Sequence, residues 1–272
     1  MMRWLRSLTG SRRARQTGIP SGLWEHTLAH YPFLQASDTV ALRTMARDFL
    51  DAKEFHGANG LHITDAMAIA IAAQACLPVL QVQTPWTGTA WYDDFVGIVV
   101  HPGSMRARRE NVDEAGIVHQ YAEVLSGEAM QDGPITLSWQ DVAASGATAA
   151  QGYNVVIHEF VHKIDMRDGM PDGCPPLYAG FMGADSAKTA RIAWRATLEQ
   201  QYLAFCDRLS LAERFGGEPV WLDPYAATAQ DEFFAVASEA YFVNRAQFAS
   251  DFPGLLPMFD AFFNLQTAVG RA

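Results

Sequence analysis

The residues His158-Glu159-Phe160-Val161-His162 have the types and spacing that metal-dependent hydrolysis requires. Residues four apart on a helix lie nearly above one another, so His158 and His162 can direct two imidazole nitrogens at one Zn²⁺, about 2.0–2.1 Å away. Glu159 is one step round the helix, where its carboxylate can accept a proton from a water that the metal activates. The alternative is a chance pattern of two core histidines bonded to carbonyls. The flanking apolar residues predict an internal helix, where such polar groups need partners.

A third metal ligand must come from elsewhere in the chain, because a catalytic zinc site usually has three protein ligands and one open position. A metzincin would have a histidine six residues after His162, where Asp168 stands, so that class is excluded. The predicted helix over 231–239 carries Glu232 and Glu239. They are separated by about 10.5 Å of helical rise, so both cannot bind one ion. Helical periodicity does not show which of the two is the third ligand. Each can also be a solvated carboxylate on the helix surface, or a carboxylate that accepts a hydrogen bond from a metal ligand.

Caps and breakers outline the elements around this motif. Ser37-Asp38 and Thr64-Asp65 predict helix starts, and Pro78 ends the second of these helices. The predicted strands are Val79–Val82, Phe95–Val100, Ile117–Val124 and Ile135–Trp139. The predicted later helices are the motif helix over 155–164, Asp185–Phe215, Asp231–Val243 and a last segment running past Pro257. This order of helices, strands and helices indicates an α+β fold rather than an alternating βαβ fold.

The composition is that of a globular protein, with 49% hydrophobic and 18% charged residues among 272. A net charge of −10 excludes a general nucleic-acid binder, and the absence of a run of about 18 apolar residues predicts no membrane span. Arginines dominate the first residues, and we expect a disordered basic tail over 1–18. Three widely spaced cysteines without a CxxC motif argue against a disulfide framework and a thiolate zinc site, and indicate the cytoplasm; they are Cys76, Cys174 and Cys206.

Three segments carry a resemblance to a known family. They are HEFVHKID at 158–165, GPITLSW at 133–139 and DPYAATAQDEFFAVASEAYF at 223–242. Together they resemble the Mlc titration factor A family of bacterial zinc peptidases, and the catalytic part is similar to the zincin domain of anthrax lethal factor. The resemblance extends from Tyr31 through GLHITD and IAAQACLPVL to the C-terminal helix, so it covers nearly everything except the basic tail.

The resemblance implies roles for further residues. It implies that Glu232 is the third ligand of one zinc ion per chain, and it leaves Glu239 as a partner of a ligand. It also implies that Tyr225, in the loop before the ligand helix, donates a hydrogen bond to the oxyanion of the tetrahedral intermediate; the alternative is a tyrosine packed at a loop corner. Asp165 can orient a ligand imidazole, cap the end of the motif helix, or form a salt bridge with neighbours of Lys163.

The resemblance also implies the architecture. We expect one zincin-like catalytic domain over 19–272, with an upper lobe at about 19–168 and a lower lobe at about 169–272. A small mixed sheet would pack on the active-site helix, and the C-terminal lobe would be mainly helical. In zincins an extended substrate pairs with a sheet edge above this helix, and Ile135–Trp139 is the candidate edge. The segment Met166–Gly183 is either a lid or an inert connection.

Two functions follow. The first is a zinc-dependent metallopeptidase that hydrolyses peptide bonds, and the resemblance favours aminopeptidase-like action on short peptides. The second is a regulatory binding protein, because the resemblance implies sequestration of the glucose repressor Mlc and an effect on the sugar phosphotransferase system. A structural zinc domain is the weaker interpretation, since no fourth protein ligand is evident. The sequence identifies no substrate-binding residue.

Overall fold

The structure is a computed structural model that describes residues 19–112, 118–169 and 171–264. The predicted basic tail and Ile117 lie outside the described residues. The helices are α1 (Ser21–Leu28), α2 (Thr39–Ala52), α3 (Asp65–Cys76), α4 (Trp139–Thr148), α5 (Val155–Asp165), α6 (Ala187–Phe215), α7 (Gln230–Val243), α8 (Arg245–Asp251) and α9 (Leu256–Phe263). The strands are β1 (Glu54–Gly57), β2 (Gly97–His101), β3 (Met105–Val112), β4 (Val118–Leu125), β5 (Gly127–Ala129) and β6 (Ile135–Ser138).

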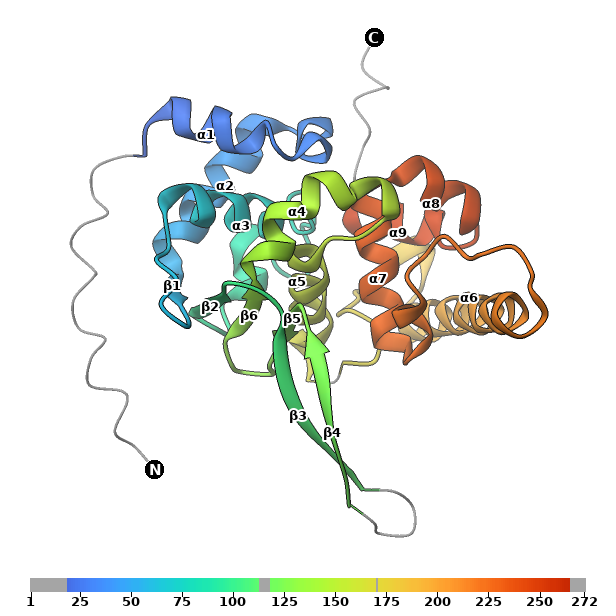
Figure 1. Cartoon of the computed structure of the whole chain (residues 1–272). Coiled ribbons are helices and arrows are strands. Elements are labelled where there is room, and N and C mark those ends of the chain that lie inside the picture. Colours follow the sequence, from blue (N-terminus) through green and yellow to red (C-terminus); the bar gives the residue numbers. More distant parts are fainter. Residues whose placement is uncertain (1–18, 113–117, 170, 265–272) are drawn as a thin grey trace.

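Four of the strands form a mixed sheet in the order β1-β2-β6-β5. β1, β2 and β6 are parallel, with Ile98 of β2 opposite Ile135 of β6, and β5 pairs antiparallel with β6. β3 and β4 pair with each other in a long hairpin that projects from the sheet, whereas α6 to α9 gather on the other side of α5 (Figure 1). The small mixed sheet and the helical C-terminal part confirm the predicted α+β, zincin-like class.

The prediction that Ile135–Trp139 forms the substrate edge is wrong. This segment is β6, and it is paired on both sides, with β2 and with β5. The edge strand on this side of the sheet is β5, which covers only Gly127–Ala129. Three residues are too few to show the alternation of apolar and polar side chains that identifies a strand. The sequence pattern therefore does not reveal β5.

The predicted strand at Val79–Val82 is also wrong, although its burial is real. Val79 and Val82 are buried, but the chain turns there, and Leu80 donates its N–H to the carbonyl of Leu77. A short apolar run looks the same in a buried turn as in a buried strand. The predicted caps are confirmed, since Asp38 accepts from the first N–H groups of α2 and Thr64 accepts from Met67 of α3.

A continuous apolar core reaches from Trp24 to Phe263 and encloses α5. Phe160, on α5, packs against the rings of Phe49, Tyr92 and Phe95 at centroid distances of 5.6, 4.9 and 6.0 Å. This packing fixes the rotation of α5 about its axis and therefore decides which of its side chains face the sheet and which face α7. The division into lobes near residue 168 stays a prediction. Within the described ranges, no helix has the length and apolarity to cross a bilayer.

Candidate metal centre

The helix α5 brings the two motif histidines together. Asn154 caps its start, accepting the N–H of Ile157, so the helix begins at Val155, three residues before His158. His158 and His162 then lie one turn apart on the same face, as their spacing predicts. Their Nε2 atoms are 3.1 Å apart.

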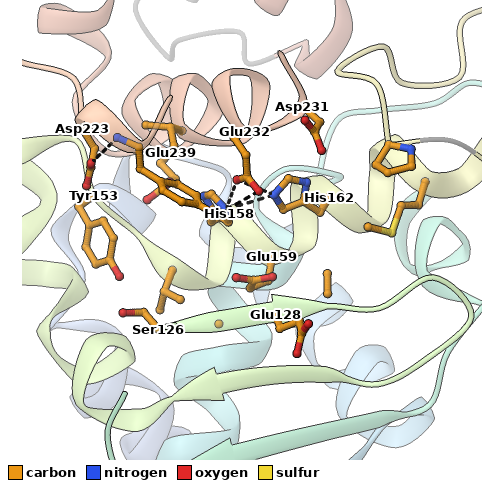
Figure 2. A pocket seen from close by; sticks show the side chains of 17 residues that line it. Ser126, Glu128, Tyr153, His158, Glu159, His162, Asp223, Asp231, Glu232 and Glu239 are labelled. Atoms are coloured by element: carbon orange, nitrogen blue, oxygen red, sulfur yellow. Dashed lines mark hydrogen bonds and ion pairs between the residues drawn. The ribbon is translucent and has the colours of Figure 1, made fainter. Parts of the chain in front are cut away.

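Glu232, in the first turn of α7, completes a cluster of three possible ligands. Its Oε2 atom lies 3.1 Å from the Nε2 of His158 and 3.2 Å from the Nε2 of His162 (Figure 2). Burial alone raises the pKa of Glu232, but the two imidazoles beside its carboxylate outweigh burial and hold this pKa well below its usual value. Glu232 is therefore a carboxylate that presents one oxygen to both rings.

The mutual distances of these three atoms fit a metal ion. Tetrahedral ligands about 2.0–2.1 Å from a metal lie about 3.3–3.4 Å from one another, close to the 3.1–3.2 Å found here. Two imidazole nitrogens and one carboxylate oxygen are a donor set that suits zinc. Three lone-pair-bearing atoms at this separation repel one another unless a proton or a cation lies among them.

Glu239 determines which nitrogen of His158 carries the proton. Its Oε1 is 2.8 Å from the Nδ1 of His158, and its Oε2 accepts the backbone N–H of Asn154 at 2.5 Å. Because a carboxylate only accepts, Nδ1 of His158 carries a proton, which leaves Nε2 as the nitrogen that can offer a lone pair to a metal ion. Glu239 thus holds both the start of α5 and the imidazole of His158. This is the arrangement expected of a residue that orients a metal ligand by a hydrogen bond.

Glu159 lies beneath the cluster, between α5 and the edge strand (Figure 2). Its side chain is buried, and burial raises the pKa of Glu159 to about 7. A carboxyl group that titrates near neutral pH suits both acceptance and donation of a proton. The strand β5 touches it closely: a Cβ added to Gly127 would lie 2.6 Å from Cγ of Glu159 and 2.7 Å from its Cδ. Glycine is therefore required at this point of contact.

Tyr225 lies at the rim of the same site. Its hydroxyl donates a hydrogen bond to Oε1 of Glu232 at 3.2 Å, and its ring centroid is 6.1 Å from that of His158. The side chain is partly exposed. Tyr225 therefore contacts the predicted third ligand and lines the same cavity as the cluster.

A cavity of about 410 Å³ opens over these groups. β5 forms one wall, with Glu128 and Ala129, and α7 forms the opposite wall, with Asp231 beside Glu232 (Figure 2). Tyr153 closes one end. The structure thus brings together all five predicted site residues, which are His158, Glu159, His162, Tyr225 and Glu232.

Two contacts in the site, those of Asn154 and Gly127, are not predicted from the sequence, although an asparagine just before a helical run is a recognisable cap. Gly127 gives no local sign of its contact with Glu159, which depends on tertiary packing. Asp165 does not hydrogen-bond a ligand imidazole among the described residues. Its Oδ2 accepts the N–H of Gly173 at 2.8 Å, so it fastens the segment after α5.

Comparisons with known proteins identify the family of this chain. The model of the glucose-regulated metallo-peptidase M90 family matches residues 4–264. Mlc titration factor A of Klebsiella pneumoniae is 33% identical over 242 residues, which cover 88% of this chain and 84% of that protein. Mlc titration factor A of Salmonella arizonae is 33% identical over 247 residues, covering 89% and 90%. The chain therefore belongs to the glucose-regulated metallo-peptidase M90 family.

Proposed function

We propose that this protein is a zinc-dependent peptidase, with His158, His162 and Glu232 as the ligands of one zinc ion per chain. The observation that carries the proposal is the convergence of two imidazole nitrogens and one carboxylate oxygen within 3.2 Å, beside a buried glutamate. A zinc ion bound there would polarise a peptide carbonyl and lower the pKa of a water molecule.

Glu159 is the general base and then the general acid. It accepts a proton from the water that attacks the carbonyl carbon of the peptide bond. It then donates that proton to the nitrogen of the leaving amine as the C–N bond breaks. Burial supports both roles, because it raises the pKa of Glu159 to about 7, where the carboxyl group can both accept and donate a proton.

Tyr225 steadies the oxyanion that forms when water adds to the carbonyl. Its hydroxyl donates a hydrogen bond, and a donor aimed at developing charge lowers the barrier more than it strengthens ground-state binding. The hydroxyl now donates to Glu232, so it changes partner as the oxyanion develops.

The edge strand β5 is the candidate binding surface for the peptide backbone. β5 is paired with β6 on one side and borders the cavity on the other. An extended peptide can therefore add to it by main-chain hydrogen bonds, with its scissile bond over Glu159. The resemblance to the Mlc titration factor A family favours aminopeptidase-like action on short peptides, and the three free cysteines are consistent with a cytoplasmic enzyme.

The substitution Glu159→Gln tests the proposal. It keeps the size of the side chain and removes its ability to accept a proton, so kcat should fall about 10²–10⁴-fold. Zinc content, measured by native mass spectrometry, should stay at one ion per chain. The matched control is Glu199→Gln, at an exposed position on α6. Full peptide hydrolysis by the Glu159→Gln protein would refute the assignment of the base.

A second function is favoured by the relatives. Proteins named Mlc titration factor A are 33% identical over most of this chain, so binding of an Mlc-type repressor is a candidate function here. Such binding would modulate the sugar phosphotransferase system without cleavage of the repressor. Pull-down of purified repressor by the Glu159→Gln protein separates the two functions, because binding that survives the loss of hydrolysis supports a docking role.

A further inference from the structure

A second face of α5 is directed at the edge strand. Glu159 and Lys163 are four residues apart, so they lie on one face of α5, about a quarter-turn from the face of the two histidines. Glu159 contacts Gly127 of β5. Lys163 is fully buried, which is costly for an ammonium group unless every donor has a partner.

The ammonium group of Lys163 has three such partners. It donates to the carbonyl of Met130 at 2.6 Å and to the carbonyl of Gly133 at 2.9 Å, and it lies 3.4 Å from Oδ2 of Asp94. The group has three N–H bonds, so its donors are saturated. The ring of Phe95 lies 4.6 Å from the same nitrogen. This arrangement leaves the ammonium little freedom to move.

The two carbonyls belong to the turn that joins β5 to β6. Met130 directly follows β5, and Gly133 closes the turn by donating its N–H to the carbonyl of Met130. The helix α5 therefore contacts β5 near both ends: Glu159 meets Gly127 at its start, and Lys163 holds Met130 just after its end. Two contacts fix both the height of a strand above the helix and its tilt relative to the helix axis, whereas one contact fixes only its height.

We propose that Lys163 is a positioning residue, which holds β5 at the height and tilt required for an extended peptide to pair with it above Glu159. The inference rests on the proposed peptidase function. It explains why a charge is buried where an apolar side chain would pack at a lower desolvation cost: only directed hydrogen bonds fix carbonyl positions. In the described part of the chain, the ammonium of Lys163 contacts Met130, Gly133, Asp94 and Phe95, and Lys163 does not line the cavity, so it acts through the strand.

The chain offers a matched control in Lys53. This lysine is also buried, donates to two backbone carbonyls, those of Tyr92 and Phe95, at 2.5 Å each, and lies 4.1 Å from the ring of Phe95. It immediately precedes β1, at the opposite edge of the sheet. Replacing Lys53 by methionine removes a comparable buried ammonium without releasing β5.

The experiment compares Lys163→Met with Lys53→Met and the wild type on two substrates. One is a hexapeptide long enough to pair along β5, and the other is an amino-acid anilide that is too short to do so. Loss of one or two aligned backbone hydrogen bonds weakens binding about tenfold, so Lys163→Met should raise KM for the hexapeptide by that factor. KM for the anilide, the zinc content and the hexapeptide KM of Lys53→Met should stay near wild type. Amide hydrogen exchange over residues 127–138 should accelerate only in Lys163→Met.

Each outcome decides the proposal. Equal hexapeptide KM values in the two variants, or unchanged exchange over β5 and β6, would overturn it. If the wild type hydrolyses neither substrate, the peptidase function fails, and the exchange comparison still decides whether Lys163 positions the strand. If Lys163→Met does not fold, Lys163→Gln replaces it, because the shorter amide keeps a polar donor but cannot reach both carbonyls.

Discussion

At the scale of single residues, the proton on His158 decides whether the cluster can bind a cation. The contact between Nδ1 and Glu239 keeps a proton on the far side of the ring, so Nε2 is the nitrogen that can present a lone pair to a cation beside His162 and Glu232. The sequence predicts the two histidines and Glu159 because helical spacing is local. The partner of His158 depends on how α7 packs against α5, and spacing within α7 leaves Glu232 and Glu239 equivalent.

Glu239→Gln should weaken metal binding without unfolding the protein. The amide nitrogen of glutamine would face the N–H of Asn154, and the ring of His158 would lose its charged acceptor. Loss of such a partner typically costs 10–100-fold in metal affinity, so we expect about that decrease in a chelator competition titration. Ser238→Ala is the control, since Ser238 is buried on the same helix and its hydroxyl donates to the carbonyl of Phe234, away from the metal ligands. Equal metal affinities of the two variants would contradict the role of Glu239.

Tyr225→Phe separates two roles for one hydroxyl. If the hydroxyl donates to the oxyanion, kcat should fall about 10²-fold while KM and metal affinity change little. If it serves only to hold Glu232, metal affinity should fall and kcat at saturating zinc should recover. Steady-state kinetics at several zinc concentrations distinguish the two results. We expect the first, and Tyr178→Phe, at an exposed tyrosine outside the cavity, is the control.

At the scale of elements, the most predictable parts are those with local signals. The caps at Asp38 and Thr64 fix the starts of α2 and α3, and the left-handed Gly216 ends α6 at Phe215, as predicted. Pairing is less predictable, because hydrogen bonds between strands join residues far apart in the chain. The three-residue edge β5 and the buried turn at Val79–Val82 both show that an apolar or short segment does not reveal its pairing partner.

Asp165, the last residue of α5, should make the free energy of unfolding depend on pH. This side chain is buried, one of its oxygens has no hydrogen-bond partner in the described part of the chain, and burial raises the pKa of Asp165 well above its usual value. The folded state then binds a proton more tightly than the unfolded state, in which the pKa is about 3.9. Asp165 therefore stabilises the folded state fully at pH values below its unfolded-state pKa. This contribution to the free energy of unfolding is lost as pH rises through the folded-state pKa.

Asp165→Asn removes this titration and keeps an oxygen to accept the N–H of Gly173. The stability of the variant relative to wild type should therefore increase between pH 4 and pH 8, with both proteins freed of metal so that loss of metal at acid pH does not contribute. Urea unfolding at a series of pH values measures the difference. A difference that is constant with pH would show that Asp165 ionises alike in the folded and unfolded chains.

At the scale of the whole molecule, the ligands come from two helices that are distant in the sequence and adjacent in the core. α5 supplies His158 and His162, and α7 supplies Glu232. Both helices are buried along most of their length, and the apolar core is continuous from Trp24 to Phe263. The sequence predicts each helix separately. Only the family resemblance pairs them, because the order of helices along a chain does not specify which of them touch.

Removal of the metal should therefore destabilise the entire chain at once. A metal that binds only the folded state at about 1,000 times its Kd adds about 4 kcal/mol to the free energy of unfolding, which corresponds to roughly 10 °C in Tm for a domain of this size. Differential scanning calorimetry with and without a chelator should show that decrease in one cooperative transition, because α5 and α7 share a single core. His162→Ala should show no such shift on addition of zinc. Two separated transitions would contradict the single domain predicted over 19–272, and an unchanged Tm would contradict a metal bridge between α5 and α7.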